Sequence, residues 1–153
     1  MTAPTLEELL QLDSLCLREA SGGPLDLDAH RARLTQSMAQ SRFAWVRRSG
    51  ALVAYGYMWP RDAACWFVGG LAIHPHHRNA GVTAELLDSF IRLVGDSGAR
   101  ELHSHVLATN TASLKLHRRL GFTEAQRNDT AIAFVVSVVD LAMNALSLRA
   151  RDR

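Results

Sequence analysis

Cysteine, excess charge and long apolar runs are all scarce in this sequence. Its two cysteines, Cys16 and Cys65, lack the spacing of a metal site or a disulfide framework, which favours free thiols in a reducing cytoplasm. The formal net charge is only +2, with acidic and basic residues alternating along most of the chain, so nucleic acid is not an expected partner. The longest uncharged apolar run, 131–139, is about half as long as a membrane-spanning helix, so no membrane association is expected.

Internal repeats, low-complexity tracts and linkers are also missing, so residues 1–153 are predicted to form a single domain. The hydrophobic content of 48% and the charged content of 21% are typical of a soluble globular protein. The first residues carry acidic side chains and no basic stretch ahead of an apolar one, which predicts no secretory signal and a cytoplasmic location.

Helical spacing dominates the start of the chain. Six leucines recur at roughly helical intervals over 6–17, which predicts a first helix that ends at the glycines that follow. Asp26 or Asp28 is expected to cap a second helix that continues through Met38. The solvent-exposed face of this second helix is predicted to carry three basic residues, His30, Arg31 and Arg33.

Strand and helix patterns alternate along the rest of the chain. Strands are predicted within 42–60, where Ser49 and Gly50 join two of them, and at 65–74, 101–108 and 130–141. Helices are predicted at 81–94 and 111–121, with a tail helix at the end. A helical crossover places the 65–74 and 101–108 strands side by side and parallel. The expected fold class is α/β, with a mixed β-sheet flanked by helices.

Two adjacent glycines, Gly69 and Gly70, stand in the middle of the 65–74 strand. They would weaken an ordinary strand, and glycine in such a place usually marks a bulge or the close approach of another backbone or a ligand. The pattern therefore predicts an irregular point in the centre of the sheet.

The segment AIHPHHRNAG, residues 72–81, joins this strand to the next helix. Pro75 ends the strand, Gly81 opens the helix, and Arg78 adds a permanent positive charge with forked donors. The N–H groups of a helix start favour an anion such as phosphate, although a polar loop that only caps the helix has the same pattern. The signature of a P-loop is absent. The histidines of the segment lack converging spacing, so no metal site is predicted.

Two segments together resemble the GNAT superfamily of N-acetyltransferases. LAIHPHHRNAGVTAELL, residues 71–87, is similar to the family's acyl-CoA-binding motif, in which R/Q-x-x-G-x-G/A follows an apolar strand. NTASLKLHRRLGF, residues 110–122, is similar to the family's second motif. The resemblance implies two splayed central parallel strands. It also implies direct transfer of an acetyl group from acetyl-CoA to a primary amine of a small molecule or peptide, through a ternary complex and without a metal.

The resemblance also implies roles for individual residues. The pantetheine arm would lie along the backbone of the 65–74 strand, and the pyrophosphate would lie at the start of the following helix. The expected CoA-binding residues are Leu71, Ala72, Ile73, Arg78, Asn79, Ala80, Gly81, Val82, Thr83, Asn110 and Ser113. His117 takes the place of a tyrosine that often protonates the leaving thiolate, and is the expected acid. His105 is the candidate base for the amine, with Asp62 as a weaker one.

Departures from the family pattern keep other functions open. Asn79 stands where glycine is common and Thr83 where the motif has Gly or Ala, so the pyrophosphate pocket is expected to be narrower. A non-catalytic acyl-CoA-binding or regulatory domain of the same fold is one alternative. A homodimer formed through the C-terminal strand, 131–139, is another. Four aromatic residues belong either to the acceptor side or to the core: Tyr55, Tyr57, Trp59 and Trp66. Acidic residues are scarce around them, which argues against polyamine or aminoglycoside acceptors.

Overall fold

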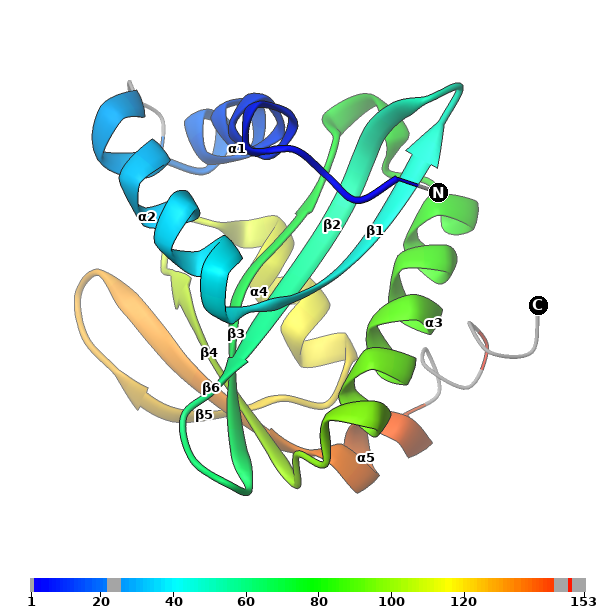
Figure 1. The fold of residues 1–153 in the computed structure, drawn as a ribbon. Coiled ribbons are helices and arrows are strands. Elements are labelled where there is room, and N and C mark those ends of the chain that lie inside the picture. The colour runs from blue at the N-terminus through cyan, green and yellow to red at the C-terminus, as the bar shows by residue number, and fades with distance from the viewer. Residues whose placement is uncertain (1, 22–25, 145–148, 150–153) are drawn as a thin grey trace.

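One mixed sheet of six strands organises the fold in the computed structural model, which describes residues 2–21, 26–144 and 149 (Figure 1). The strands lie in the order β1-β2-β3-β4-β6-β5, with β3 and β4 parallel and every other neighbouring pair antiparallel. Their bounds are β1 Arg42–Arg48, β2 Ala51–Pro60, β3 Cys65–Ile73, β4 Glu101–Leu107, β5 Thr123–Arg127 and β6 Ala131–Ser137. The apolar 65–74 strand is central, as its composition predicts.

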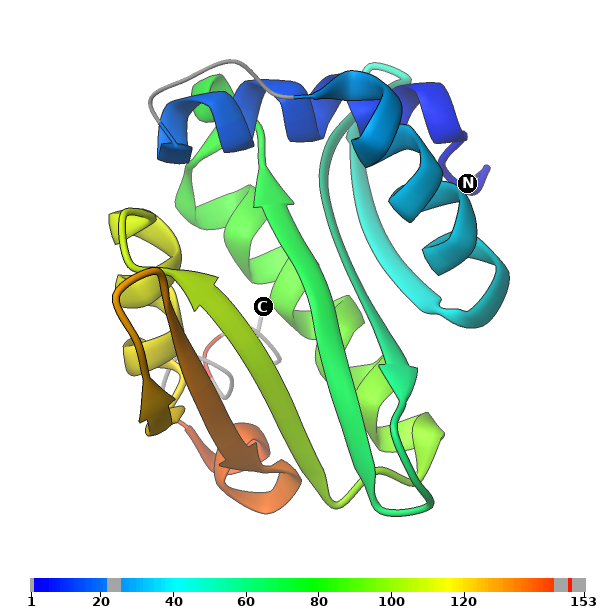
Figure 2. The same ribbon diagram turned by 90° about the vertical axis from the view of Figure 1, so that its left-hand side faces the viewer.

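Helices cover both faces of this sheet. Figure 2 shows α1 and α2 in front of the β1–β3 part of the sheet and α3 behind it. The helices are α1 Leu6–Ser21, α2 Leu27–Gln40, α3 Ala80–Ser97, α4 Thr111–Arg119 and α5 Val138–Met143, with a short 3-10 turn at Pro75–His77. None of the helices in the described part of the chain is both long enough and apolar enough to cross a membrane.

Apolar side chains form one core on each face. The larger core lies between the sheet and the α3, α4 and α5 helices, and includes Leu86, Leu102 and Phe134. The smaller core lies between the sheet and the α1–α2 pair, and includes Leu9 and Leu34. Because both faces of β2 are covered, that strand is buried along most of its length.

Capping residues set the starts of α2 and α3. The Asp26 carboxylate accepts the N–H of Ala29 at 3.1 Å, as the sequence predicts. The Asn79 side chain caps α3, which passes through Gly95 and ends at Gly98 in the left-handed conformation. The placement of His30 on the exposed face of α2 is wrong. Its ring is buried against α1, whereas Arg31 and Arg33 are exposed as predicted.

The C-terminal part of the sheet differs from the sequence prediction. The strand β5 was not predicted, because its residues are polar, exposed and without apolar alternation. The last strand stops at Ser137, whose hydroxyl accepts the N–H of Asp140 and so caps α5. Since β5 pairs along one side of β6 and β4 along the other, β6 is not an edge strand. Both edges of β6 are therefore paired within the chain, and a homodimer through residues 131–139 stays a prediction. The predicted tail helix beyond α5 lies largely outside the described residues.

Candidate functional site

The parallel pair β3 and β4 separates halfway along its length. Pairing runs from Cys65 opposite Glu101 to Val68 opposite Ser104 and then stops. Directly after Val68, the pairing of β3 with β2 skips Gly69, which is an extra residue in the ladder. A bulge increases local twist, and this one turns the second half of β3 away from β4. The splay that the family resemblance implies is therefore present, and it leaves one edge of β3 open to a cleft.

The glycine pair is required by aromatic rings that lie against β3. A Cβ atom built on Gly70 would lie 2.5 Å from Cε1 of Tyr57, and one built on Gly69 would overlap the rings of Tyr57 and Trp59. The prediction of a bulge with a close approach is confirmed, but protein side chains occupy the space on this face. The open edge of β3, and not the face above the glycines, is where a ligand could lie.

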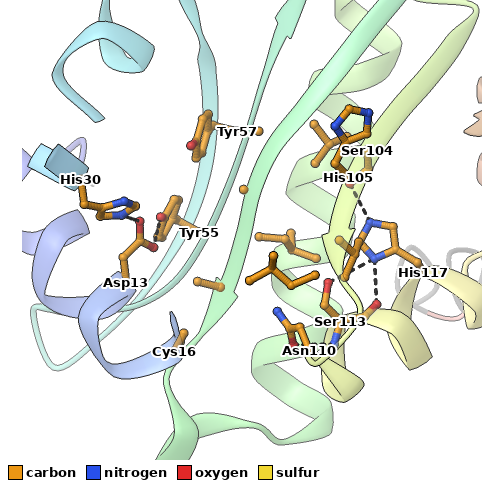
Figure 3. A pocket seen from close by; sticks show the side chains of 17 residues that line it. Asp13, Cys16, His30, Tyr55, Tyr57, Ser104, His105, Asn110, Ser113 and His117 are labelled. Atoms are coloured by element: carbon orange, nitrogen blue, oxygen red, sulfur yellow. Dashed lines mark hydrogen bonds and ion pairs between the residues drawn. The ribbon is translucent and has the colours of Figure 1, made fainter. Parts of the chain in front are cut away.

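Two connected chambers make up the cleft. The large chamber has a volume of about 210 Å³ and lies between the end of β3, the start of α3 and α4. The small chamber has a volume of about 170 Å³ and lies between β3, β4 and the α1–β2 side (Figure 3). The residues that line both chambers, and so mark their junction, are Cys16, Leu71, Ala72, Asn110 and Ser113.

Basic side chains line the large chamber. Arg78 and Arg119 reach it from the loop before α3 and from the end of α4, and Thr83 adds a hydroxyl. Arg119 was not among the predicted site residues, although its place in the last turn of α4 beside the second motif is a visible signal. Two guanidinium groups near a helix start form a site of positive potential that suits phosphate.

The N–H groups at the start of α3 are partly engaged within the protein. The Asn79 side-chain oxygen accepts the N–H of Val82 at 2.9 Å, and the Asn79 carbonyl accepts the N–H of Thr83 at 3.1 Å. The N–H of Asn79 itself donates to the His77 carbonyl. A phosphate that used the Val82 N–H would have to displace the Asn79 side chain, which is the residue that replaces the more usual glycine.

Asn110 places a polar group at the junction of the two chambers. It caps α4 by accepting the N–H of Ser113 with its side-chain oxygen at 3.2 Å. Because this bond uses only the oxygen, the NH₂ group of the amide still carries two donor hydrogens. Asn110 and Ser113 therefore present polar groups to both chambers, and their contact with a pantetheine arm stays a prediction.

His117 is buried on α4 beside the small chamber. Its ring lies between Phe122 and Phe134, and both of its nitrogens are bonded. The Nδ1–H group donates to the Ser113 carbonyl at 2.8 Å, because a carbonyl can only accept, and Nε2 then accepts the Ser104 hydroxyl at 2.9 Å. Burial lowers the pKa of His117 below its ordinary value of 6.5, with an opposing contribution from the Ser113 hydrogen bond. In this arrangement the ring is neutral.

A buried polar cluster on the other side of β3 was missed from the sequence. The Asp13 carboxylate of α1 accepts a hydrogen bond from Nε2 of His30 at 2.6 Å and another from the Tyr55 hydroxyl, as Figure 3 shows. Asp13 and His30 are 6% and 8% exposed, and both line the small chamber. Burial first, and then the Asp13 charge, raises the pKa of Tyr55 well above its ordinary value, so its hydroxyl stays a donor. The sequence does contain a signal for this cluster, because Asp13 is an acidic residue among the apolar side chains of the first helix.

The two candidate bases occupy different places. His105 is exposed at the rim of the small chamber, where its ring meets Phe67 edge-on with centroids 5.0 Å apart. Asp62 does not line either chamber. Its carboxylate accepts the N–H groups of Ala64 and Cys65, and these bonds lower its pKa. Asp62 therefore has a structural role at the start of β3.

Most of the predicted site residues converge on the cleft. Those whose side chains or backbone line it are Leu71, Ala72, Ile73, Arg78, Thr83, His105, Asn110, Ser113 and His117. Four residues predicted at the start of α3 do not line it: Asn79, Ala80, Gly81 and Val82. The Val82 side chain belongs to the larger core. Tyr55 and Tyr57 line the small chamber, whereas Trp66 is buried in the core on the opposite face.

A mixed sheet whose central parallel strands separate around such a cleft is the fold of the GNAT acetyltransferases. The sequence model of the Acetyltransferase (GNAT) family matches residues 6–122, and the chain belongs to this family. It is 36% identical over 61 residues to the aminoglycoside N(6')-acetyltransferase type 1 of Salmonella typhimurium. That match covers 40% of this chain and 42% of the relative, so it spans well under half of the curated relative's length.

Two solved structures share the fold. One is the PaiA N-acetyltransferase of Thermoplasma acidophilum in complex with coenzyme A, at a TM-score of 0.71 and 12% identity over 86% of this chain and 92% of that one. The other is a GNAT family acetyltransferase from Elizabethkingia anophelis with acetyl-CoA bound, at a TM-score of 0.62 and 13% identity over 76% and 93% of the two chains. At these identities the likeness concerns the fold.

Proposed function

We propose that this protein is an N-acetyltransferase that transfers an acetyl group from acetyl-CoA directly to a primary amine. The observation that supports this proposal is one continuous cleft whose two ends carry opposite charge. Arg78 and Arg119 make one end basic, a buried carboxylate, Asp13, lies at the other end, and the open edge of β3 runs between them. A cleft of this kind can hold a polyanionic thioester at one end and a cationic amine at the other.

Acetyl-CoA would lie with its phosphates in the large chamber and its thioester at the junction. Arg78, Arg119 and the Thr83 hydroxyl would hold the phosphates. The pantetheine arm would run beside β3 as an added strand, because the N–H and C=O groups along that edge have no ladder to β4 after Val68. The amide of Asn110 and the hydroxyl of Ser113 would fix the arm at the junction. Support for the co-substrate comes from related folds that carry coenzyme A or acetyl-CoA.

The reaction would be a direct attack of the amine on the thioester carbonyl carbon. A C–N bond forms, the C–S bond breaks, the amine loses a proton, and the CoA thiolate leaves and gains one. Holding both reactants in one cleft supplies most of the rate enhancement, because oriented reactants react at about 10⁵–10⁸ M effective concentration. N–H groups along the open edge of β3, near Ile73, would stabilise the oxyanion of the tetrahedral intermediate.

Asp13 would bind the ammonium group of the acceptor in the small chamber. Its carboxylate keeps lone pairs for a further donor after accepting from His30 and Tyr55. These two hydrogen bonds orient the carboxylate, so that its remaining lone pairs can accept from an ammonium group in the chamber. His105 at the exposed rim would then take the proton and pass it to solvent.

His117 would act in thiolate protonation through the Ser104 hydroxyl. Its Nε2 would first take up a proton from solvent and would then give it to the Ser104 oxygen, while the Ser104 hydroxyl gives its own proton to the thiolate. Its neutral ring has no proton directed into the cleft, and Ser104 is the group that links its Nε2 to the chamber wall. We expect His117→Phe to keep acetyl-CoA binding and to lower kcat, because the coenzyme contacts are elsewhere. Turnover of His117→Phe at the wild-type rate with a good acceptor would exclude this role.

The acceptor that fits best is a cationic primary amine. Asp13 is the one carboxylate among the described residues that line this chamber, so it would recognise one ammonium group. The stacked rings of Tyr55 and Tyr57 suit the carbon skeleton beside it. The scarcity of acidic residues that argued against aminoglycosides from the sequence alone is offset in part by Asp13. Aminoglycosides are therefore included among the acceptors to be tested, together with small amines and peptide N-termini.

Thermal unfolding with acetyl-CoA, CoA or ATP tests coenzyme binding. A ligand at about 100 times its Kd adds about 2.7 kcal/mol to the free energy of unfolding, which raises the Tm by several degrees. We expect a shift with acetyl-CoA and CoA and none with ATP, followed by amine-dependent release of the CoA thiol. The neutral state of His117 favours one rival, a non-catalytic acyl-CoA-binding domain. The non-catalytic domain predicts the same Tm shift but no thiol release with any amine. A Tm that stays unchanged with acetyl-CoA and CoA would contradict both the acetyltransferase and the non-catalytic domain.

A further inference from the structure

Three side chains with metal-ligating atoms meet at the paired end of β3 and β4. Cys65 and Glu101 are direct register partners, and His103 follows Glu101 two positions along β4. Because alternate residues of a strand point to the same side, all three project from one face of the sheet. The Cys65 sulfur, a Glu101 carboxylate oxygen and a His103 ring nitrogen lie within 4.8 Å of one another. None of the three lines either chamber of the cleft.

We propose that Cys65, Glu101 and His103 bind a divalent cation of the zinc type. Thiolate, imidazole and carboxylate are the protein ligands of Zn²⁺, with bonds of about 2.0–2.3 Å in tetrahedral geometry. At those bond lengths the ligand atoms are about 3.5 Å apart, so the side chains have to close by about 1 Å. The His103 and Glu101 side chains are 29% and 49% exposed, which leaves room for that rotation and for a water molecule as fourth ligand.

The charges around the cluster favour a cation. The Asp62 carboxylate is close enough to act electrostatically on both the Cys65 thiol and the His103 ring. Arg61 opposes it, but its guanidinium lies over the Phe67 ring, 5.4 Å from the centroid. Two carboxylates and one arginine leave a net negative charge beside the thiol, which a divalent ion would neutralise.

Two existing hydrogen-bond arrangements hold the ligands in place before an ion binds. Nε2 of His103 donates to Oε1 of Glu101 at 2.6 Å, so these two side chains already lie together. The Asp62 carboxylate accepts the N–H groups of Ala64 and Cys65 at 2.9 and 2.8 Å, which fixes the backbone at the start of β3. An ion here would join β3 to β4 below the point where the strands separate. The site would therefore stabilise the base of the cleft and take no part in acyl transfer.

A cobalt titration of the full-length, metal-free protein in a phosphine reductant tests the site. Co²⁺ reports a cysteine ligand through a thiolate-to-metal charge-transfer band, and added Zn²⁺ should remove that band by displacement. We expect the band in the wild type, its loss in Cys65→Ser, and an affinity for Co²⁺ lowered at least about tenfold in His103→Ala. The matched control is Cys16→Ser, which removes the other free thiol and should keep the band.

Thermal unfolding of the same variants separates loss of the site from loss of the fold. Zn²⁺ should raise the Tm of the wild type and of Cys16→Ser, and should leave the Tm of Cys65→Ser and His103→Ala unchanged. A charge-transfer band that persists in Cys65→Ser, an unchanged affinity in His103→Ala, or no band with excess Co²⁺ would each overturn the proposal. None of these readouts depends on acetyltransferase activity.

Discussion

Acid should destabilise this protein through His117, and the size of the effect follows from its burial. The ring is 5% exposed, lies against Phe134, and is held neutral by hydrogen bonds from its Nδ1–H and to its Nε2. Because burial lowers the pKa of His117 in the folded state, the unfolded chain takes up a proton first as the pH falls through the ordinary value of 6.5. The free energy of unfolding therefore decreases with falling pH over this window.

The magnitude comes from proton linkage. Between about pH 7.5 and about pH 5.5 an unfolded histidine goes from about one tenth to about nine tenths protonated. If the folded ring stays neutral throughout, the loss of unfolding free energy integrates to about 1.4 kcal/mol. This is an upper limit for one histidine, and it is reached only when the folded ring remains unprotonated at the lower pH.

Urea unfolding at the two pH values measures the loss. We expect His117→Gln to be less stable than the wild type at the higher pH, because burying an amide in a site shaped for imidazole weakens the packing. The same variant should lose less stability on acidification, by up to about 1.4 kcal/mol. His76→Gln, on the exposed loop before α3, is the matched control and should behave as the wild type. An identical pH dependence in wild type and His117→Gln would refute the reasoning.

Three further predictions concern the cleft and its scaffold. Gly81→Glu should weaken acetyl-CoA binding at least about tenfold, because the new carboxylate would repel the phosphates of the coenzyme. Two unit charges about 6 Å apart at an effective dielectric constant of about 40 repel each other by about 1.4 kcal/mol. Gly81→Ala is the control and should bind acetyl-CoA normally in isothermal titration. Asp13→Asn should raise the KM for cationic amines more than it lowers kcat, and an equal effect on neutral acceptors in steady-state assays would contradict ammonium binding. Gly70→Ala should cost about 1–3 kcal/mol in urea unfolding because its Cβ meets the Tyr57 ring, whereas Gly95→Ala, which meets nothing within 4 Å, should stabilise α3 by about 0.5–1 kcal/mol.

The elements that could be predicted from the sequence are those whose signals are local. Helical leucine spacing, the Asp26 cap, the turn at Ser49 and Gly50 and the strand end before Pro75 each depend on a few neighbouring residues, and each is present in the structure. The bulge at Gly69 belongs to the same group, because glycine in a strand interior has few other uses. The strand β5 escaped prediction because its pairing with β6, and not its own composition, makes it a strand.

In the candidate site, too, the parts with local sequence signals could be predicted, and the parts that depend on long-range contacts could not. The order and spacing of the two motifs were enough to indicate the basic end of the cleft, since each motif occupies one strand-to-helix or loop-to-helix junction. The end that we propose for the acceptor depends on residues that are far apart in the chain. Asp13 meets Tyr55 across 42 positions of sequence, and His30 reaches the same carboxylate from a different helix.

Sequence by itself determined the fold class, the family and the basic start of α3, because periodicity, caps and short motifs act within single elements. Tertiary packing decided which polar groups are removed from water. In the packed structure the His117 ring is buried and neutral, and His30 faces Asp13 and not solvent. Cys65 lies beside Glu101 and His103 of the next strand. Hydrogen-bond partners and burial depend on which surfaces face each other once helices and strands have packed, and this information is not contained in any local window of the chain.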